Sequence, residues 1–179
     1  MRTLVLALSV ASFTATQGVV LSAQSSSGDN MSQCPMMEPS KDSRHAAMEM
    51  HGDQTMGFAH DKTTHHFLLA GRGGLIEVKA NDPGDIASVD AIRSHLAHIA
   101  TMFRSGDFSA PMFVHSTIPP GVTAMKLLKK KIRYTYEPLE AGGRVRIESS
   151  DPVAVAAVQD FLRFQITDHQ TGDPLTGGL

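Results

Sequence analysis

The chain has 179 residues, a formal net charge of −2 and a single cysteine, Cys34. Because the charge is nearly balanced and no basic surface is indicated, nucleic acid is excluded as an expected partner. One cysteine excludes an intramolecular disulfide, and the length allows one domain with a hydrophobic core plus terminal segments.

Residues 1–23, MRTLVLALSVASFTATQGVVLSA, have the features of a secretory signal peptide. One positive charge is followed by an apolar stretch and by a small residue, Ala23, at a plausible cleavage point. Polar Ser and Thr interrupt the apolar stretch, which favours a signal peptide over a membrane-spanning helix or a fold-forming helix. We therefore expect a periplasmic or extracellular protein that does not insert into a membrane after cleavage.

Residues 24–57 are rich in Ser, Gly, Asp, Gln, Met and His and contain hardly any branched apolar side chains. Such a segment buries too little surface to offset the entropy of ordering, so it is predicted to be a disordered leader.

The same region concentrates potential metal ligands, because six of the ten Met and five of the nine His lie between Met31 and His66. The donors are Cys34, Met36, Met37, His45, Met48, Met50, His51, Met56 and His60. Thiolate and thioether sulfur favour Cu(I), and imidazole suits either oxidation state of copper. The pattern predicts copper capture; the alternative is a low-complexity linker with incidental Met.

Residues 58–179 form the predicted domain, and they contain an internal repeat. GGLIEVKANDP at 73–83 corresponds to GGRVRIESSDP at 142–152, with a constant spacing of 69. Each copy has a Gly-Gly turn, an alternating strand and an Asp-Pro pair, which is a helix-start signal. A further strand is predicted before each turn, in HHFLLA and in KIRYTYE.

Long helices are predicted after each Asp-Pro, from about 85 to 105 and from about 153 to 169. The chain is therefore expected to be α+β, with two ββα units. These units should form a mainly antiparallel four-stranded sheet with two helices packed on one face.

The domain carries a second group of candidate ligands. In the first helix, His95, His98 and Met102 lie at i, i+3 and i+7, beside the apolar stripe, so they could share an ion. His65 and His66 are adjacent on a strand and must point to opposite faces, so at most one of them faces the helices, where His95 or His98 could join it. Such a His site would suit Zn²⁺ or Cu²⁺.

The remaining histidines of the domain are less informative. His115 lies in the long connection after residue 106 and is a further candidate ligand. His169 is explained adequately by its position near a helix C-terminus, where it complements the helix dipole.

The segments MGFAHDKTTHHFLL, HLAHIATMF, GDFSAPMFVH, PPGV and FLRFQITDHQTGDP resemble a family of small secreted bacterial proteins. The resemblance covers roughly residues 56–175 and implies that the His-bearing segments are part of the domain's identity. Some members carry the label aspartate carbamoyltransferase. This chain lacks that enzyme's S-T-R-T type phosphate motif and is too short for its two-domain fold, so no catalytic residue follows from the resemblance.

Two classes of function follow from these patterns. The first is a periplasmic or secreted metal-binding protein, most simply for copper, in capture, delivery or detoxification, with a periplasmic protein as a possible partner. The second is a small metal-dependent enzyme whose His-bound ion lies between the sheet and the first helix and keeps an open position. A haem binder with His and Met axial ligands, or an interaction module without metal, remain alternatives.

Overall fold

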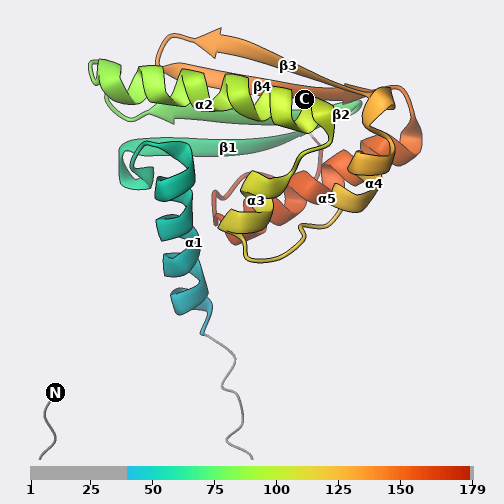
Figure 1. The fold of residues 1–179 in the computed structure, drawn as a ribbon, viewed down its shortest axis with the longest axis horizontal. Helices are drawn as coiled ribbons and strands as arrows, with labels where there is room; N and C mark the ends of the chain where they lie inside the picture. The colour runs from blue at the N-terminus through green and yellow to red at the C-terminus, as the bar shows by residue number, and fades with distance from the viewer. Residues whose placement is uncertain (1–39, 178–179) are drawn as a thin grey trace, which may run out of the picture. The chain divides into compact units, whose positions relative to one another are not determined.

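The structure, a computed structural model, describes residues 40–177. The predicted signal peptide and three candidate ligands, Cys34, Met36 and Met37, lie outside the described residues. The helices are α1 Lys41–Met56, α2 Ile86–Ser105, α3 Ser109–Val114, α4 Val122–Leu127 and α5 Pro152–Asp168, with short 3₁₀ turns η1 His60–Lys62 and η2 Lys129–Lys131. The strands are β1 Thr63–Ala70, β2 Gly73–Ala80, β3 Ile132–Leu139 and β4 Gly142–Ser149 (Figure 1).

The four strands form one antiparallel sheet in the order β1-β2-β4-β3. Each strand of the second hairpin begins and ends 69 residues after its counterpart in the first, as the repeat predicted. In the central pairing Ile76 lies opposite Val145, and these two residues are themselves 69 apart. The two ββα units are therefore related by a pseudo-two-fold axis through this pair, and the predicted α+β fold is confirmed.

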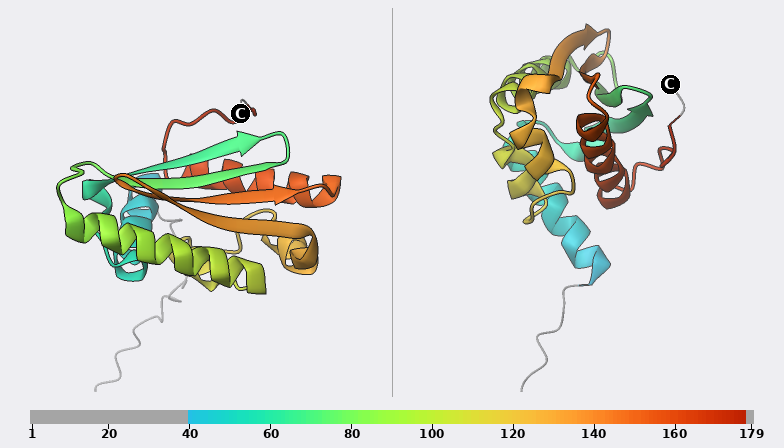
Figure 2. Two further views of the ribbon diagram at one scale, coloured as in Figure 1. Left: turned by 90° about the horizontal axis from the view of Figure 1, so that it is seen from above. Right: turned by 90° about the vertical axis from the view of Figure 1, so that its right-hand side faces the viewer.

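The two long helices pack on one face of the sheet, but each crosses to the hairpin of the other unit. Helix α2 packs mainly on β4 and β3, whereas α5 packs on β1 and β2 (Figure 2). A glycine allows the close approach of α5, because a Cβ on Gly74 would lie 2.3 Å from Leu162 of that helix. A Cβ on Gly143 would instead lie 2.9 Å from the Tyr136 ring, with Leu96 of α2 farther away at 3.4 Å.

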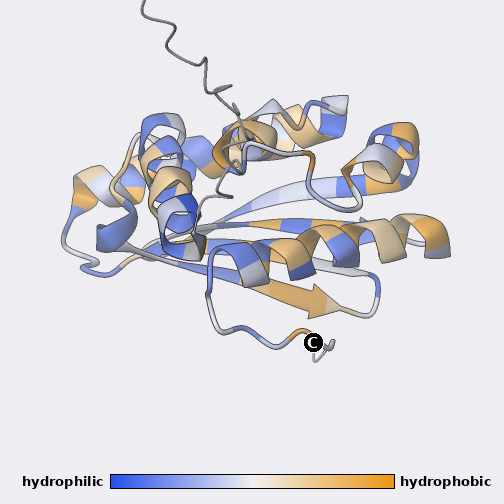
Figure 3. Ribbon diagram, turned by 90° about the horizontal axis from the view of Figure 1, so that it is seen from below, coloured by the Kyte–Doolittle hydropathy of each residue, from blue (hydrophilic) through white to orange (hydrophobic). Residues whose placement is uncertain are grey.

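The core lies between this sheet face and the helices. The predicted apolar stripe of α2 is buried, with Ile92 at 0% and Phe103 at 2% exposure. The carboxyl end of β1 is apolar (Figure 3), and its inward residues Phe67 and Leu69 join the same core. Within residues 40–177 there is no helix long and apolar enough to cross a membrane.

The folded region begins before Phe58, which differs from the predicted extent of the disordered leader. Helix α1 occupies residues 41–56, and its Met48 is buried. Its first turn is capped by the Ser40 hydroxyl, which accepts from the Ser43 N–H, and Gly57 ends it in a left-handed conformation. Composition alone missed this helix because a few Met side chains, not branched residues, provide its apolar contacts.

The two Asp-Pro pairs do not act in the same way. Asp151 caps α5 and Pro152 is its first residue, as predicted. In the first unit, Asp82 instead accepts from the Gly84 N–H in a turn, and Asp85 caps α2. Gly84, which follows Pro83 and has no counterpart in the second unit, permits this extra turn before the helix starts.

Candidate metal site

The adjacent pair His65-His66 is divided between the two faces of β1. His65 points to the helix side, as do its strand neighbours Phe67 and Leu69. The His66 Nδ1 lies 2.9 Å from Asp173 Oδ1, and the other oxygen of Asp173 accepts from the Phe67 N–H at 2.9 Å. His66 therefore ties the C-terminal segment to the edge of β1 and lies away from the cavities that His65 lines.

A cavity of about 240 Å³ lies between α1 and β1, and we call it the α1 cavity. Its lining contains four imidazoles, two thioethers and one carboxylate. These belong to His45, Met48, Glu49 and Met56 of α1, to His60 and His65, and to His169 at the end of α5. The segment predicted to be a leader and the predicted domain thus contribute ligands to the same space.

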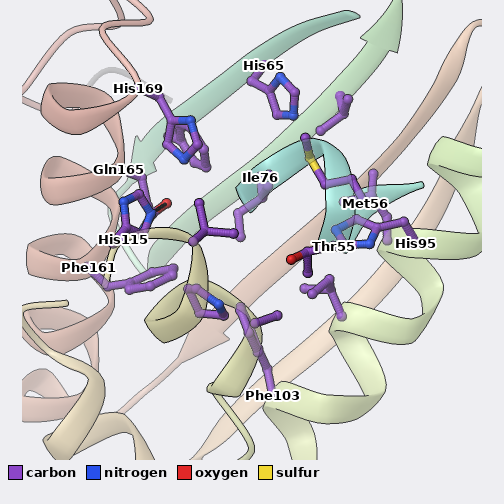
Figure 4. A pocket seen from close by; sticks show the side chains of 18 residues that line it. Thr55, Met56, His65, Ile76, His95, Phe103, His115, Phe161, Gln165 and His169 are labelled. Atoms are coloured by element: carbon purple, nitrogen blue, oxygen red, sulfur yellow. Dashed lines mark hydrogen bonds between the residues drawn. The ribbon is translucent and has the colours of Figure 1, made fainter. Parts of the chain in front are cut away.

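A smaller inner cavity of about 90 Å³ continues from the α1 cavity toward the core (Figure 4). The two cavities share Met56, His65 and His169. The rings of His65 and His169 are nearly parallel, with centroids 6.0 Å apart and planes inclined by 11°. Apolar side chains such as Ile76 and Phe161 form much of the remaining wall of the inner cavity. The imidazoles of His65 and His169 therefore lie where the polar lining of the α1 cavity meets the apolar lining of the inner cavity.

Two ring nitrogens at the α1 cavity are buried and have no hydrogen-bond partner, His65 Nε2 and His45 Nδ1. The other nitrogen of His45, Nε2, lies 3.1 Å from Glu49 Oε1. A carboxylate at this distance fixes the proton on Nε2 and leaves the lone pair on Nδ1, which is the arrangement found around metal-binding histidines. Glu49 also lies 3.4 Å from His60 Nε2, and Asp53 lies 3.1 Å from His60 Nδ1.

Burial keeps two of these imidazoles neutral. Burial first, and then the neighbouring His95, His60 and His66, lower the pKa of His65 to about 4. The pKa of His169 is also lowered well below its usual value, by burial and then by other histidines around it. Because a metal ion binds the neutral ring, these histidines are in the binding form throughout the neutral pH range.

His115 has both ring nitrogens occupied. Its Nδ1 lies 2.5 Å from Asp168 Oδ2 and its Nε2 lies 2.9 Å from Gln165 Oε1, and the side chain is only 1% exposed. It therefore joins the end of α3 to α5 and offers no free lone pair to an ion. Within the described part of the chain, no hydroxyl or thiol bonds to His115. The His115–Asp168 pair therefore lacks the nucleophile of a catalytic triad.

His95 joins His65 in the lining of the inner cavity, whereas His98 does not. The ring of Phe58 packs against both imidazoles, with its centroid 6.3 Å from that of His65 and 5.8 Å from that of His95. Burial, and then His98, lower the pKa of His95 to about 4. His95 also lines, together with His98 and Met102, a cavity beside α3 of about 300 Å³. These three residues are grouped on α2 as their spacing in the sequence predicted.

Two further candidates lie outside the α1 cavity. Met50 is 59% exposed on the outer side of α1. The ring of His51 packs against Phe113, with centroids 4.8 Å apart, and the His51 Nδ1 is buried without a partner.

Two residues of the α1 cavity, His169 and Glu49, were not predicted to take part. His169 had been explained by the helix dipole, and one sequence gives no signal that pairs Glu49 with His45.

Among the residues that the structure describes, no three His, Cys, Asp or Glu side chains are already placed to hold one metal ion. A site in this arrangement would therefore combine fewer than three imidazoles with thioether sulfur.

Comparison of the chain with protein-family models, with curated proteins and with solved structures gives no match.

Proposed function

We propose that this chain is an exported copper-binding protein that captures Cu(I) in the α1 cavity, for delivery or detoxification. One observation carries the proposal: Met48, Met56 and four imidazoles line the same cavity, and two of the imidazole nitrogens are buried without a partner. A buried polar atom without a hydrogen-bond partner destabilises the fold. A bound ligand that contacts these nitrogens would explain why they are present.

The donor set supports copper more than zinc. Thioether sulfur is a soft ligand that selects Cu(I), whereas structural Zn²⁺ sites use thiolate, imidazole and carboxylate in a closed tetrahedron. We assign the Cu(I) contacts to His65 Nε2, to His45 Nδ1 and to the sulfur of Met56, with Met48 and His169 beside them. Cu(I) accepts low coordination numbers, so this set suffices without a further imidazole.

Glu49 has a supporting role in this proposal. Its carboxylate lies 3.1 Å from His45 Nε2, so it orients the ring with Nδ1 left for the ion. The neutral state of His65 means that no proton has to leave this ring when the metal enters near pH 7.

Residues 1–23 support export, because they read as a signal peptide. A copper-binding protein in the periplasm or outside the cell would meet the metal before it reaches the cytoplasm. Capture, delivery and detoxification all need the same first step, reversible binding of the ion in an accessible cavity. The α1 cavity is the part of the described chain that offers such a step.

The test is an anaerobic competition titration of the full chain with Cu(I) against a coloured Cu(I) chelator. We expect one tightly bound ion in the α1 cavity, and at least a roughly tenfold loss of affinity for His65→Ala and for the double variant Met48→Leu, Met56→Leu. Met50→Leu is the matched control, because Met50 is on the same helix but exposed.

Equal affinity in the wild type and in these variants would contradict the proposal, as would the absence of Cu(I) binding in competition with a weak chelator. A parallel titration with Zn²⁺ separates the two metals. Tighter binding of Zn²⁺ than of Cu(I) at the same residues would replace copper by zinc in the account.

A further inference from the structure

A second group of soft and borderline donors lies at the other end of the cavity system. His95, His98 and Met102 follow one another along one side of α2 at i, i+3 and i+7, and all three line the cavity beside α3, which we call the α2 cavity. His98 is exposed, and the other two are half-buried. Thr55 of α1 and Phe113 of α3 form part of the opposite wall.

The α2 cavity adjoins the inner cavity through His95, which lines both. The inner cavity in turn shares Met56 and His65 with the α1 cavity. Each of the three connected cavities, the α1 cavity, the inner cavity and the α2 cavity, is therefore lined by imidazole and thioether groups; Figure 4 shows those of the inner cavity. The Phe58 ring packs against both His65 and His95. The α1 cavity and the α2 cavity share no lining residue, so their two ends hold distinct groups of donors.

We propose that His95, His98 and Met102 form a second Cu(I) site, weaker and more exposed than the one in the α1 cavity. The proposal rests on the proposed function for the choice of metal. Two imidazoles and one thioether at i, i+3 and i+7 lie on one side of the helix and line one cavity, and they form a set of borderline and soft donors.

The open side of the α2 cavity supports binding at this position. The exposure of His98 leaves one side of the site open, which lowers its affinity and allows the ion to leave. A weak site at the surface beside a tighter internal one is an arrangement that suits exchange of the ion with an acceptor.

The test uses Ag(I) as a redox-inert probe and the full chain with ¹³C-methyl-labelled methionine. Substitutions remove soft donors of the N-terminal segment from this chain, namely Cys34→Ser, Met36→Leu and Met37→Leu. Each methyl signal is assigned by Met→Leu substitution. We expect the Met48 and Met56 signals to shift with the first equivalent of Ag(I), and the Met102 signal to shift with the second. Met125, which is fully buried in the core, and the exposed Met50 serve as controls that stay in place.

The variants separate the two sites. His98→Ala, at an exposed position that leaves the core intact, should abolish or weaken the Met102 shift by about tenfold in Ag(I) concentration while the Met48 and Met56 shifts persist. The double variant His95→Ala, His98→Ala should remove the Met102 response completely.

The outcomes distinguish failure of the second site from failure of the proposed function. If Met48 and Met56 respond and Met102 does not, the second site is overturned and the α1 cavity remains. If Met102 responds in the wild type but equally in His98→Ala, its sulfur binds silver without the histidines and the second site is again overturned. If only Met102 responds, and His98→Ala abolishes that response, the second site stands and the proposed α1 site fails. If no methionine responds, both fail.

Discussion

At the scale of single residues, His65 and His66 show how position decides the role of an imidazole. The alternation of a strand places one ring against the cavities and the other on the opposite face, and the sequence is sufficient to predict this division. The partner of His66 could not be predicted, because Asp173 is 107 positions away in the chain. The partners of His65 depend on two helices, α1 and α5, whose docking the strand pattern does not encode.

The lowered pKa values make stability depend on pH. His65 has a pKa of about 4 in the folded state against an ordinary value of 6.5, and the pKa of His169 is lowered in the same direction. Between about pH 4 and pH 6.5 the unfolded chain binds more protons than the folded one. The contribution of these neutral rings to the free energy of unfolding is therefore fully present above about pH 6.5 and is lost as the pH falls toward 4. For His65 the loss amounts to roughly 3 kcal/mol.

Urea unfolding at a series of pH values between 7 and 4 measures this loss. His65→Phe keeps an aromatic ring but removes the titrating group, so its free energy of unfolding should fall less steeply over the same range. An identical pH dependence in the wild type and in His65→Phe would show that His65 is not buried as a neutral ring.

At the scale of elements, glycines determine how closely the helices approach the sheet. Gly74 on β2 lies under Leu162 of α5, and Gly143 on β4 lies near Leu96 of α2. The Gly-Gly pairs were predicted to be turns, because that is the usual reason for such a pair beside a strand. In the structure they begin strands β2 and β4. Gly74 makes room for Leu162 of α5, whereas Gly143 makes room for the Tyr136 ring of β3.

Gly74→Ala should therefore destabilise the fold. Its Cβ would lie 2.3 Å from both Leu162 Cδ1 and the backbone oxygen of Leu68, so the helix or the strand has to move. We expect a loss of about 1–3 kcal/mol in the free energy of unfolding, measured by chemical denaturation.

Gly71→Ala is the matched control, because a Cβ at that position in the β1–β2 turn meets no atom within 4 Å. Its free energy of unfolding should change by less than about 0.5 kcal/mol. Similar losses in both variants would mean that the backbone freedom of glycine, and not the contact with α5, matters in this hairpin.

At the scale of the whole molecule, the repeat predicted the sheet but not the way in which the helices cover it. The predicted four strands are present, and the bounds of the two hairpins differ by the repeat spacing of 69. Ile76 and Val145, which correspond in the repeat, also face each other in the antiparallel pair of β2 and β4. The crossing of α2 and α5 to the opposite hairpins follows from packing between distant residues, which local patterns do not contain.

The candidate site shows the same difference between residue types, which the sequence predicts, and packing, which it does not. His65, Met48 and Met56 were predicted from residue type and density, whereas His169 enters because α5 ends beside β1. Helix α1 joins them because it folds against the domain, although its composition predicted disorder. Residue chemistry was thus readable from the sequence, and the convergence of the residues was not.

The central claim is that thioether sulfur and imidazole from α1 and β1 bind the same copper ion. The most direct measurement is X-ray absorption at the copper edge on the full chain carrying Cys34→Ser, Met36→Leu and Met37→Leu, loaded with one equivalent of Cu(I). The account predicts a first shell that contains both nitrogen and sulfur, and loss of the sulfur contribution in the variant Met48→Leu, Met56→Leu. A shell of nitrogen and oxygen alone, or a sulfur contribution that persists in this variant, would contradict it.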